Sequence, residues 1–289
     1  MIEFHRLNGN KTMNFWRLST QKKFTDFEVG ELLFFLAKGS ERKKEKGIIG
    51  YGRFAEHNML SVRSMWNRYG TLNGYSSELE LREAIKKVCK QDEIPQKLSC
   101  LYLKDVVFFQ YPVYLSEFGV KISNKVESYI YLDKEDEHLT NKILQKAFET
   151  GVDLWSGVIN DVSIDILEEE AVRHGVANAY STLKEITLTP TERRRAQKLM
   201  KQYRAEHGFE VIQGSKLDSF RIDGHKITIC IPLILNAKDA MVKLQMLAGR
   251  IQLYKSLLKP ENYEITYEWV SDTPVSEELN RLLKGTVNE

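Results

Sequence analysis

The order of strand-like and helix-like segments constrains the fold of this 289-residue chain more than any other feature. Short apolar and aromatic runs of strand length, with one or two helices between them, fill residues 13–132. Helical patterns then dominate as far as residue 207, before strand-like runs return at 209–233 and 263–270. Strands and helices that separate along a chain in this way predict an α+β fold. The length favours two domains over one.

The first half has several well-marked elements. We expect strands at 14–18, 32–37, 48–55, 99–103 and 106–111. The run 32–37 is continuously apolar, which predicts burial on both faces. A helix should cover 61–69 and end at Gly70, and a second should begin at Ser77, which with Glu80 forms a capping-box pattern. A helix over 135–151 closes this half, which we take as a domain of residues 1–150.

The second half begins with a helical connector, residues 151–188, in which one helix covers 162–183. Thr189-Pro190-Thr191-Glu192 is a strong helix start. That helix opens a domain of residues 189–289, an α+β unit with strands at 209–211, 220–222, 226–233 and 263–270. Two further helices are expected at 238–258 and 274–284.

The long helix at 238–258 carries apolar residues in alternating steps of four and three, a coiled-coil-like seam. The seam consists of Ala240, Leu244, Leu247, Ile251, Tyr254 and Leu258. Two interpretations remain open at this point. The seam packs on its own sheet, or it forms a homodimer or binds an effector protein.

Composition narrows the function classes. Three widely separated cysteines argue against both a disulfide framework and a zinc site, and the six histidines include no His-x-x-x-His pair. No apolar run is long enough to cross a bilayer, and the first residues lack the apolar core of a signal peptide. We therefore expect a cytoplasmic protein with no membrane partner, metal or cofactor. The net charge of +2 decides nothing, and the basic clusters 42–44 and 193–195 fit either solvated surface or nucleic-acid contact.

A search for catalytic motifs finds none. The sequence contains no phosphate-binding Gly-rich loop, no dinucleotide fingerprint and no nucleophile elbow. The nearest approach to a magnesium-dependent nuclease is Asp218 and Asp223 followed by Lys226, without the usual Glu-x-Lys spacing. The sequence therefore predicts no catalytic residue, and any enzymatic activity would be that of an endonuclease.

Aromatic residues give the first half its strongest functional signal. Rings gather near expected strand ends and loops, with Arg17, Arg53 and Arg68 among them. Stacking on a nucleobase is worth about 1–3 kcal/mol per base, and arginines can hold the phosphates. The alternative is that most of these rings fill the core of a small barrel.

The order of several short motifs is familiar. Asn14-Phe15-Trp16-Arg17 is followed by Gly30-Glu31, by the segment 49–54 and by Asn73-Gly74. This order resembles the N-terminal PUA-like (EVE-like) domain of prokaryotic modification-dependent HNH restriction endonucleases, over residues 13–147. The resemblance implies a small β-barrel with flanking helices that holds a flipped, modified base in an aromatic pocket. The chain departs from the family at Leu18, where proline is commoner, and it lacks the downstream HNH residues.

The resemblance also implies site residues. Trp16, Tyr51 and Trp66 would form the pocket walls, and Arg17 and Asn73 would contact polar edges or phosphate. The complete candidate set for nucleic-acid or base binding is Trp16, Arg17, Tyr51, Arg53, Phe54, Trp66, Tyr69 and Asn73.

The leading functional hypothesis is a nucleic-acid-binding protein that recognises modified bases in DNA, in a restriction-like bacterial defence. Two alternatives stay open. One is a single-chain modification-dependent endonuclease with an unrecognised nuclease domain in the second half. The other is an RNA-binding or adaptor protein.

Overall fold

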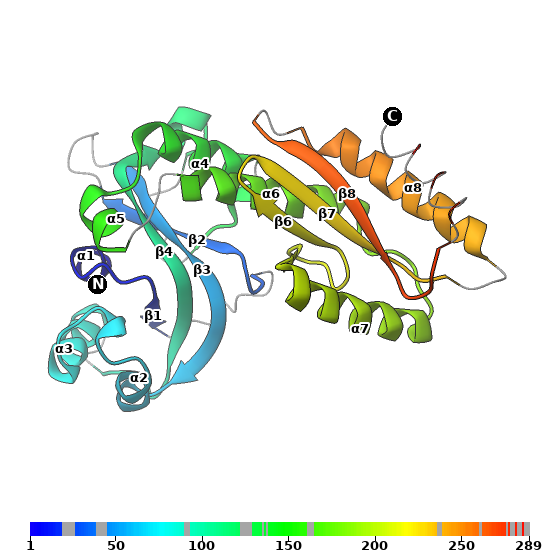
Figure 1. Ribbon diagram of the computed structural model, residues 1–289. Coiled ribbons are helices and arrows are strands. Elements are labelled where there is room, and N and C mark those ends of the chain that lie inside the picture. The colour runs from blue at the N-terminus through cyan, green and yellow to red at the C-terminus, as the bar shows by residue number, and fades with distance from the viewer. Residues whose placement is uncertain are drawn as a thin grey trace. The chain divides into compact units, whose positions relative to one another are not determined.

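A computed structural model describes residues 1–18, 27–38, 45–89, 93–121, 129–134, 136, 138–160, 165–235, 239–259, 262–275, 277, 281 and 285. The chain forms two compact units, Met1–Glu168 and Glu169–Glu289 (Figure 1). Each unit contains a four-stranded sheet together with helices. The predicted α+β class is therefore confirmed. The basic cluster 42–44 and most of the helix expected at 274–284 fall outside the described residues.

The first unit is built on a curled antiparallel sheet with the strand order β1-β4-β3-β2. Its strands are β1 (Met13–Leu18), β2 (Leu32–Lys38), β3 (Lys46–Leu60) and β4 (Leu98–Tyr114). The two runs expected at 99–103 and 106–111 form one strand, β4. Asp105, between the two runs, has a positive φ of 48°, but the strand continues through it. The long central strands, with register shifts along β3, curl the sheet into a half-barrel (Figure 1).

The expectation that 32–37 is buried on both faces was wrong. These residues lie in β2, which is an edge strand of the sheet. Within β2, Phe35 is buried, whereas Leu36 is 39% exposed. In this protein a continuous apolar run therefore forms an edge strand. One face of that strand is buried, and the other is partly exposed to solvent.

Helices and short 3-10 turns surround this sheet. They are α1 (Ile2–Leu7), α2 (Val62–Tyr69), η1 (Gly70–Asn73), α3 (Glu78–Val88), η2 (Leu115–Phe118), η3 (Leu132–Lys134), α4 (Leu139–Thr150) and α5 (Leu154–Asn160). The caps at Gly70 and Ser77 are confirmed, although the Glu80 carboxylate accepts from the backbone of Ser76 rather than of Ser77. Ser61, which was expected to be the first helical residue, is the N-cap of α2. No helix was expected from the sequence at the positions of α1 and α5.

The second unit contains a mixed sheet in the order β5-β6-β7-β8, in which β7 and β8 are parallel. Its strands are β5 (Glu210–Val211), β6 (Ser219–Asp223), β7 (Lys226–Leu233) and β8 (Glu264–Ser271). Its helices are the end of α6 (Asp165–Leu183), then α7 (Pro190–His207) and α8 (Ala240–Leu257). The capping box of Thr189 with Glu192 is present as predicted, and α7 ends at Gly208.

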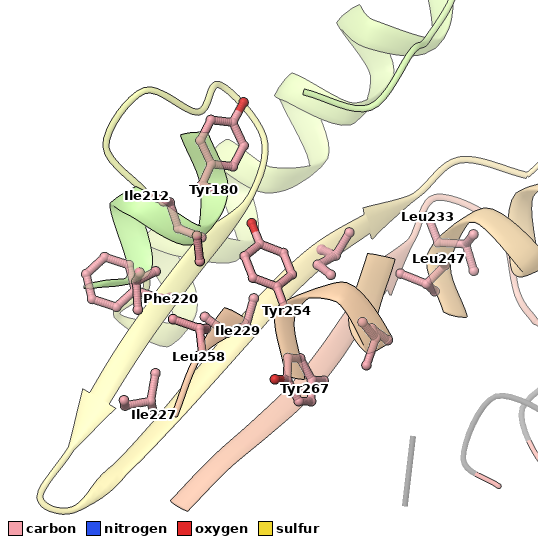
Figure 2. Packing of buried hydrophobic residues seen from close by; sticks show 14 of the residues in the cluster. Tyr180, Ile212, Phe220, Ile227, Ile229, Leu233, Leu247, Tyr254, Leu258 and Tyr267 are labelled. Carbon is pink, nitrogen blue, oxygen red and sulfur yellow. The ribbon is translucent and has the colours of Figure 1, made fainter. Parts of the chain in front are cut away.

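The seam of α8 packs on the unit's own sheet. Leu244, Leu247, Ile251 and Tyr254 are buried in one cluster with the alternate isoleucines of β7 and with residues of α6 (Figure 2). On the other face of the sheet, Met200 of α7 packs with Cys230 of β7. The first of the two interpretations of the seam is thus the one the structure supports. None of the helices in the described part of the chain is long and apolar enough to cross a membrane.

Candidate nucleic-acid interface

The candidate residues Trp16 and Arg17 of β1 lie on opposite faces of the first sheet. In β1, Trp16 lies opposite Cys100 of β4, and Arg17 lies opposite Ser99. Because successive side chains of a strand point to opposite faces, Trp16 and Arg17 serve different surfaces. Trp16 lies on the face covered by α2 and α3, where it packs in the cluster that contains Met65 and Leu81.

On the helix-covered face, Asn73 links β1 to the turn after α2. Its side-chain amide donates to the carbonyl oxygens of Gly70 (2.7 Å) and Met65 (3.3 Å), and its Oδ1 accepts from Asn14 Nδ2 at 2.7 Å. The backbone carbonyl oxygen of Asn73 accepts a hydrogen bond from Trp16 Nε1 at 3.1 Å. Asn73 is fully buried. The amide that was expected to read a base or phosphate therefore holds η1 against the sheet.

Tyr69 and Trp66 belong to the same packed cluster. The Tyr69 ring stacks on that of Tyr102 at a centroid distance of 5.5 Å, and its hydroxyl donates to the Glu56 carboxylate at 3.2 Å. Trp66 is half-buried and, like Trp16, packs against the core of this cluster. The structure thus brings together four of the candidates, Trp16, Trp66, Tyr69 and Asn73, as the contents of an aromatic core.

Tyr51 lies far from that cluster. It is opposite Val107 on β4, seven residues from the partner of Trp16, which is on the order of 20 Å along a strand. Its ring is completely buried and meets the rings of Phe34 and Phe109, each at 6.1 Å between centroids. Tyr51 is therefore not brought together with Trp16 and Trp66.

Phe54 and Arg53 also have structural partners. The Phe54 ring is buried and stacks on Phe27 at 4.6 Å between centroids. The Arg53 guanidinium donates to the carbonyl oxygen of Gly30 at 2.7 Å and lies 3.4 Å from the Asp105 carboxylate. Both side chains stabilise the region where β2, β3 and β4 meet.

The opposite face of the sheet carries a polar cluster around Arg17. Arg17 Nε donates to Ser99 Oγ at 3.5 Å, and His57 Nε2 lies 3.0 Å from the same hydroxyl. The Arg17 guanidinium carbon lies 5.2 Å from the centroid of the Tyr129 ring, within cation–π range. Met59, opposite Ser99 on β3, is partly exposed beside them. We call Arg17, His57, Met59, Ser99 and Tyr129 the Arg17 face.

The electrostatics of the Arg17 face combine a cation with a neutral imidazole. Partial burial, and then the positive charge of Arg17, lower the pKa of His57, so the ring is neutral at pH 7. Burial also lowers the pKa of Arg17, but an arginine starts so far above neutrality that it stays charged. A neutral imidazole offers one donor and one acceptor, and the guanidinium offers several donors. These groups suit a base edge and a phosphate.

Sequence reasoning found Arg17 but missed His57, Ser99 and Tyr129. The strand expected at 48–55 continues to Leu60, which places His57 on a strand instead of after one. Alternation along β3 would have been the usable signal, because His57 and Met59 share a face two residues apart. No local pattern joins Tyr129 to Arg17, since that contact is purely tertiary.

Asp218 and Asp223, the acidic residues considered for a nuclease site, each have structural partners. Asp218 is completely buried and accepts hydrogen bonds from Arg250 and Tyr254. Asp223 pairs at 2.6 Å with Arg221 and lies opposite Lys226 in the hairpin. Across the described ranges, no group of three or more His, Cys, Asp and Glu side chains could hold a metal ion.

Comparisons with known proteins add one likeness in fold. No protein-family model matches the chain, and no curated protein matches it. Among solved structures, the chain is similar to a mutant ZmASCH protein from Zymomonas mobilis, with 15% sequence identity and a TM-score of 0.33. The likeness covers 48% of this chain and 91% of that protein. Values this low concern the general fold alone.

Proposed function

We propose that the first unit binds nucleic acid through the Arg17 face and recognises a modified base in DNA there. One observation carries the proposal: a guanidinium, an imidazole and an aromatic ring, those of Arg17, His57 and Tyr129, gather on one face of the sheet. The sequence resemblance to modification-reading PUA-like domains supports the choice of DNA and of a modified base. The proposal moves the base from the predicted pocket of Trp16, Tyr51 and Trp66 to the opposite face of the sheet.

Each side chain has a distinct role in this proposal. Arg17 contacts a phosphate beside the bound base, and the Tyr129 ring offers a surface for stacking, worth about 1–3 kcal/mol. His57 presents a hydrogen-bonding group to the base edge, and buried Ser99 orients its imidazole. Removing a base from the duplex costs a few kcal/mol, which stacking and edge contacts must offset. Recognition of a base in duplex DNA is therefore weaker than recognition of the same base where it is unpaired.

The test is a binding titration with plain, methylated and hydroxymethylated DNA, each as a matched duplex and with a mismatch at the modified base. We expect the mismatch to tighten binding, because it lowers the cost of extrusion. Arg17→Ala should weaken binding by about tenfold and reduce the slope of log affinity against log salt by about one ion. Tyr129→Ala should weaken binding without changing that slope.

Two matched controls separate these effects from general ones. Arg82 lies on the exposed side of α3 and pairs with Glu78, so Arg82→Ala removes the same charge elsewhere. Tyr111 is strongly exposed at the far end of β4, so Tyr111→Ala removes a comparable ring. Binding that is equal for all three DNAs refutes the modified-base claim. Binding that is unchanged in Arg17→Ala and Tyr129→Ala refutes the site. Preference for RNA over every DNA favours the RNA-binding alternative.

A further inference from the structure

The outward side of α8 carries a row of apolar residues in addition to those on its buried side. The residues that point away from the sheet include Val242, Met246, Leu253 and Leu257, which are between 40% and 55% exposed. Together with Gly249 they follow one another at steps of four, three, four and four, which places them on one face of a helix. We call Val242, Met246, Gly249, Leu253 and Leu257 the outer stripe.

The outer stripe carries no charge, and all 18 residues of α8 are described. Its neighbours on the same side are Met241, Gln245, Gln252 and Ser256, all uncharged. A helix on a protein surface normally has charged residues opposite its apolar side, and a helix that is apolar all round is normally buried. The outer stripe therefore has the composition of a covered surface.

The cations of α8 lie away from the outer stripe. Lys243 Nζ lies 3.2 Å from the Glu192 carboxylate, and Arg250 pairs with buried Asp218 at 2.6 Å. Lys255 is half-buried on the side of the helix. Two of these three cations, Lys243 and Arg250, thus pair within the second unit, and none of the three belongs to the outer stripe.

The arrangement of the outer stripe is self-complementary. Val242 and Leu257 lie equally far along the helix from the point just after Gly249, and so do Met246 and Leu253. Two copies of α8 that pack antiparallel about a two-fold axis at this point would place Val242 against Leu257 and Met246 against Leu253. Such a contact is isologous, the commonest interface of protein dimers. Because the stripe is neutral, two copies meet without repulsion.

Gly249 fits the centre of this contact. It is the glycine of α8, and a Cβ built on it would meet nothing within 4 Å, so internal packing does not require a glycine there. At the crossing point of two helices, a glycine allows the backbones to approach closely. We propose that the outer stripe of α8 is a homodimer interface in which two copies of this chain pack antiparallel about Gly249.

The size of the stripe sets the expected strength. From Val242 to Leu257 it extends about 22 Å at 1.5 Å per residue. One helix face is smaller than the roughly 800 Å² that each partner contributes to a standard interface. We therefore expect a reversible dimer that forms in the micromolar range and not a permanent one.

Sedimentation of the full chain from low to high micromolar concentration tests the dimer. Leu253→Lys places a charge in the apolar contact and should weaken the dimer at least tenfold. Leu79→Lys is the matched control, because Leu79 is a 67% exposed leucine on α3. A chain that stays monomeric, or a dimer that Leu253→Lys leaves intact, overturns the proposal. Monomers that bind lipid vesicles through this stripe overturn it as well.

Disulfide trapping tests the antiparallel geometry, in a background where half-buried Cys89 is replaced by serine. Gly249→Cys should cross-link two copies, since the two-fold axis brings its own counterpart close. Val242→Cys should not, because the two counterparts would be about 20 Å apart and a disulfide needs Cα atoms within about 7 Å. Efficient cross-linking of Val242→Cys with itself refutes the antiparallel arrangement.

Discussion

Replacing Arg250 by methionine should destabilise the second unit more than the loss of any surface ion pair. Arg250 Nε and Nη2 lie 2.8 and 2.6 Å from Asp218 Oδ2, and the Tyr254 hydroxyl donates to the same oxygen at 2.8 Å. Asp218 and Tyr254 are completely buried, and the Arg250 side chain is almost so. This network ties α8 to the segment that leads into β6.

The expected cost follows from leaving one charge without its partner. Burial raises the pKa of Asp218, and the positive charge of Arg250 opposes that shift. Removal of one member of a buried ion pair typically costs about 3–5 kcal/mol. The guanidinium also lies over the rings of Tyr180 and Tyr254, at 5.6 and 5.4 Å, and these contacts are lost too. A loss of this size corresponds to roughly 10–20 °C in the melting temperature of the unit.

A double-mutant cycle with Asp218→Asn separates the pair from the packing. With both charges removed, most of the stability should return, so the coupling between the two sites should be about 2 kcal/mol or more. The measurement is hydrogen exchange of peptides from β7, because it reports on the second unit alone. Arg221→Met, which breaks an exposed pair with Asp223, is the control and should cost about 1 kcal/mol or less.

The result that refutes this reasoning is a loss below about 1 kcal/mol for Arg250→Met, with no coupling to Asp218→Asn. That outcome would mean that Asp218 is neutral in the folded unit and that Arg250 contributes by packing alone.

Three further predictions concern stability. Burial, and then the N-terminal charge, lower the pKa of His5 to about 4 from 6.5, so folding favours the neutral ring. The stability of the first unit should therefore fall by at most about 3 kcal/mol as the pH is lowered from 6.5 to 4. His5→Leu should abolish this pH dependence in thermal melts. Hydrogen bonds from Thr189 and Lys243 lower the pKa of Glu192 to about 2 from 4.5. The ionised carboxylate therefore stabilises the second unit above pH 4.5, and this contribution, on the order of 1–2 kcal/mol, should be lost as the pH falls towards 2. Glu192→Gln should show no such loss in acid titrations followed by circular dichroism. A Cβ at Gly50 would lie 2.3 Å from the backbone oxygen of Val107, so Gly50→Ala should cost about 3 kcal/mol in urea unfolding, and a neutral result would contradict the close approach of β3 and β4.

Two helix starts of this protein could be read from the sequence, because an N-cap side chain contacts the backbone only three residues later. Ser77 and Thr189 each accept a hydrogen bond from the backbone three positions later, as predicted. Strand lengths could not be read in the same way. Asp105 bends β4 without ending it, and β3 continues five residues past its expected end at 55, because pairing with other strands decides where a strand stops.

For the candidate site too, the sequence indicated individual residues but not the tertiary contacts between them. The sequence singled out Trp16, Arg17, Trp66 and Asn73, and the structure brings three of them together around η1. It could not show that Arg17, next to Trp16 in the chain, faces a different surface with partners from other strands. The Arg17 face requires the register that sets both Arg17 and Met59 opposite Ser99.

The sequence by itself determined the α+β class, the helix starts at Ser77 and Thr189 and the apolar seam of α8, since these depend on composition and on contacts within a few residues. Only the tertiary structure decided which surface each side chain serves. It placed the seam of α8 in the core and left a second, uncharged stripe on the outside of the same helix. It packed Trp16 and Trp66 against one aromatic cluster and gathered a polar cluster around Arg17 on the other face of the sheet. The physical reason is that the spacing of apolar residues along a helix or strand is a local property of the sequence. Which neighbouring elements cover each face of that helix or strand depends on contacts between residues that are distant in the chain.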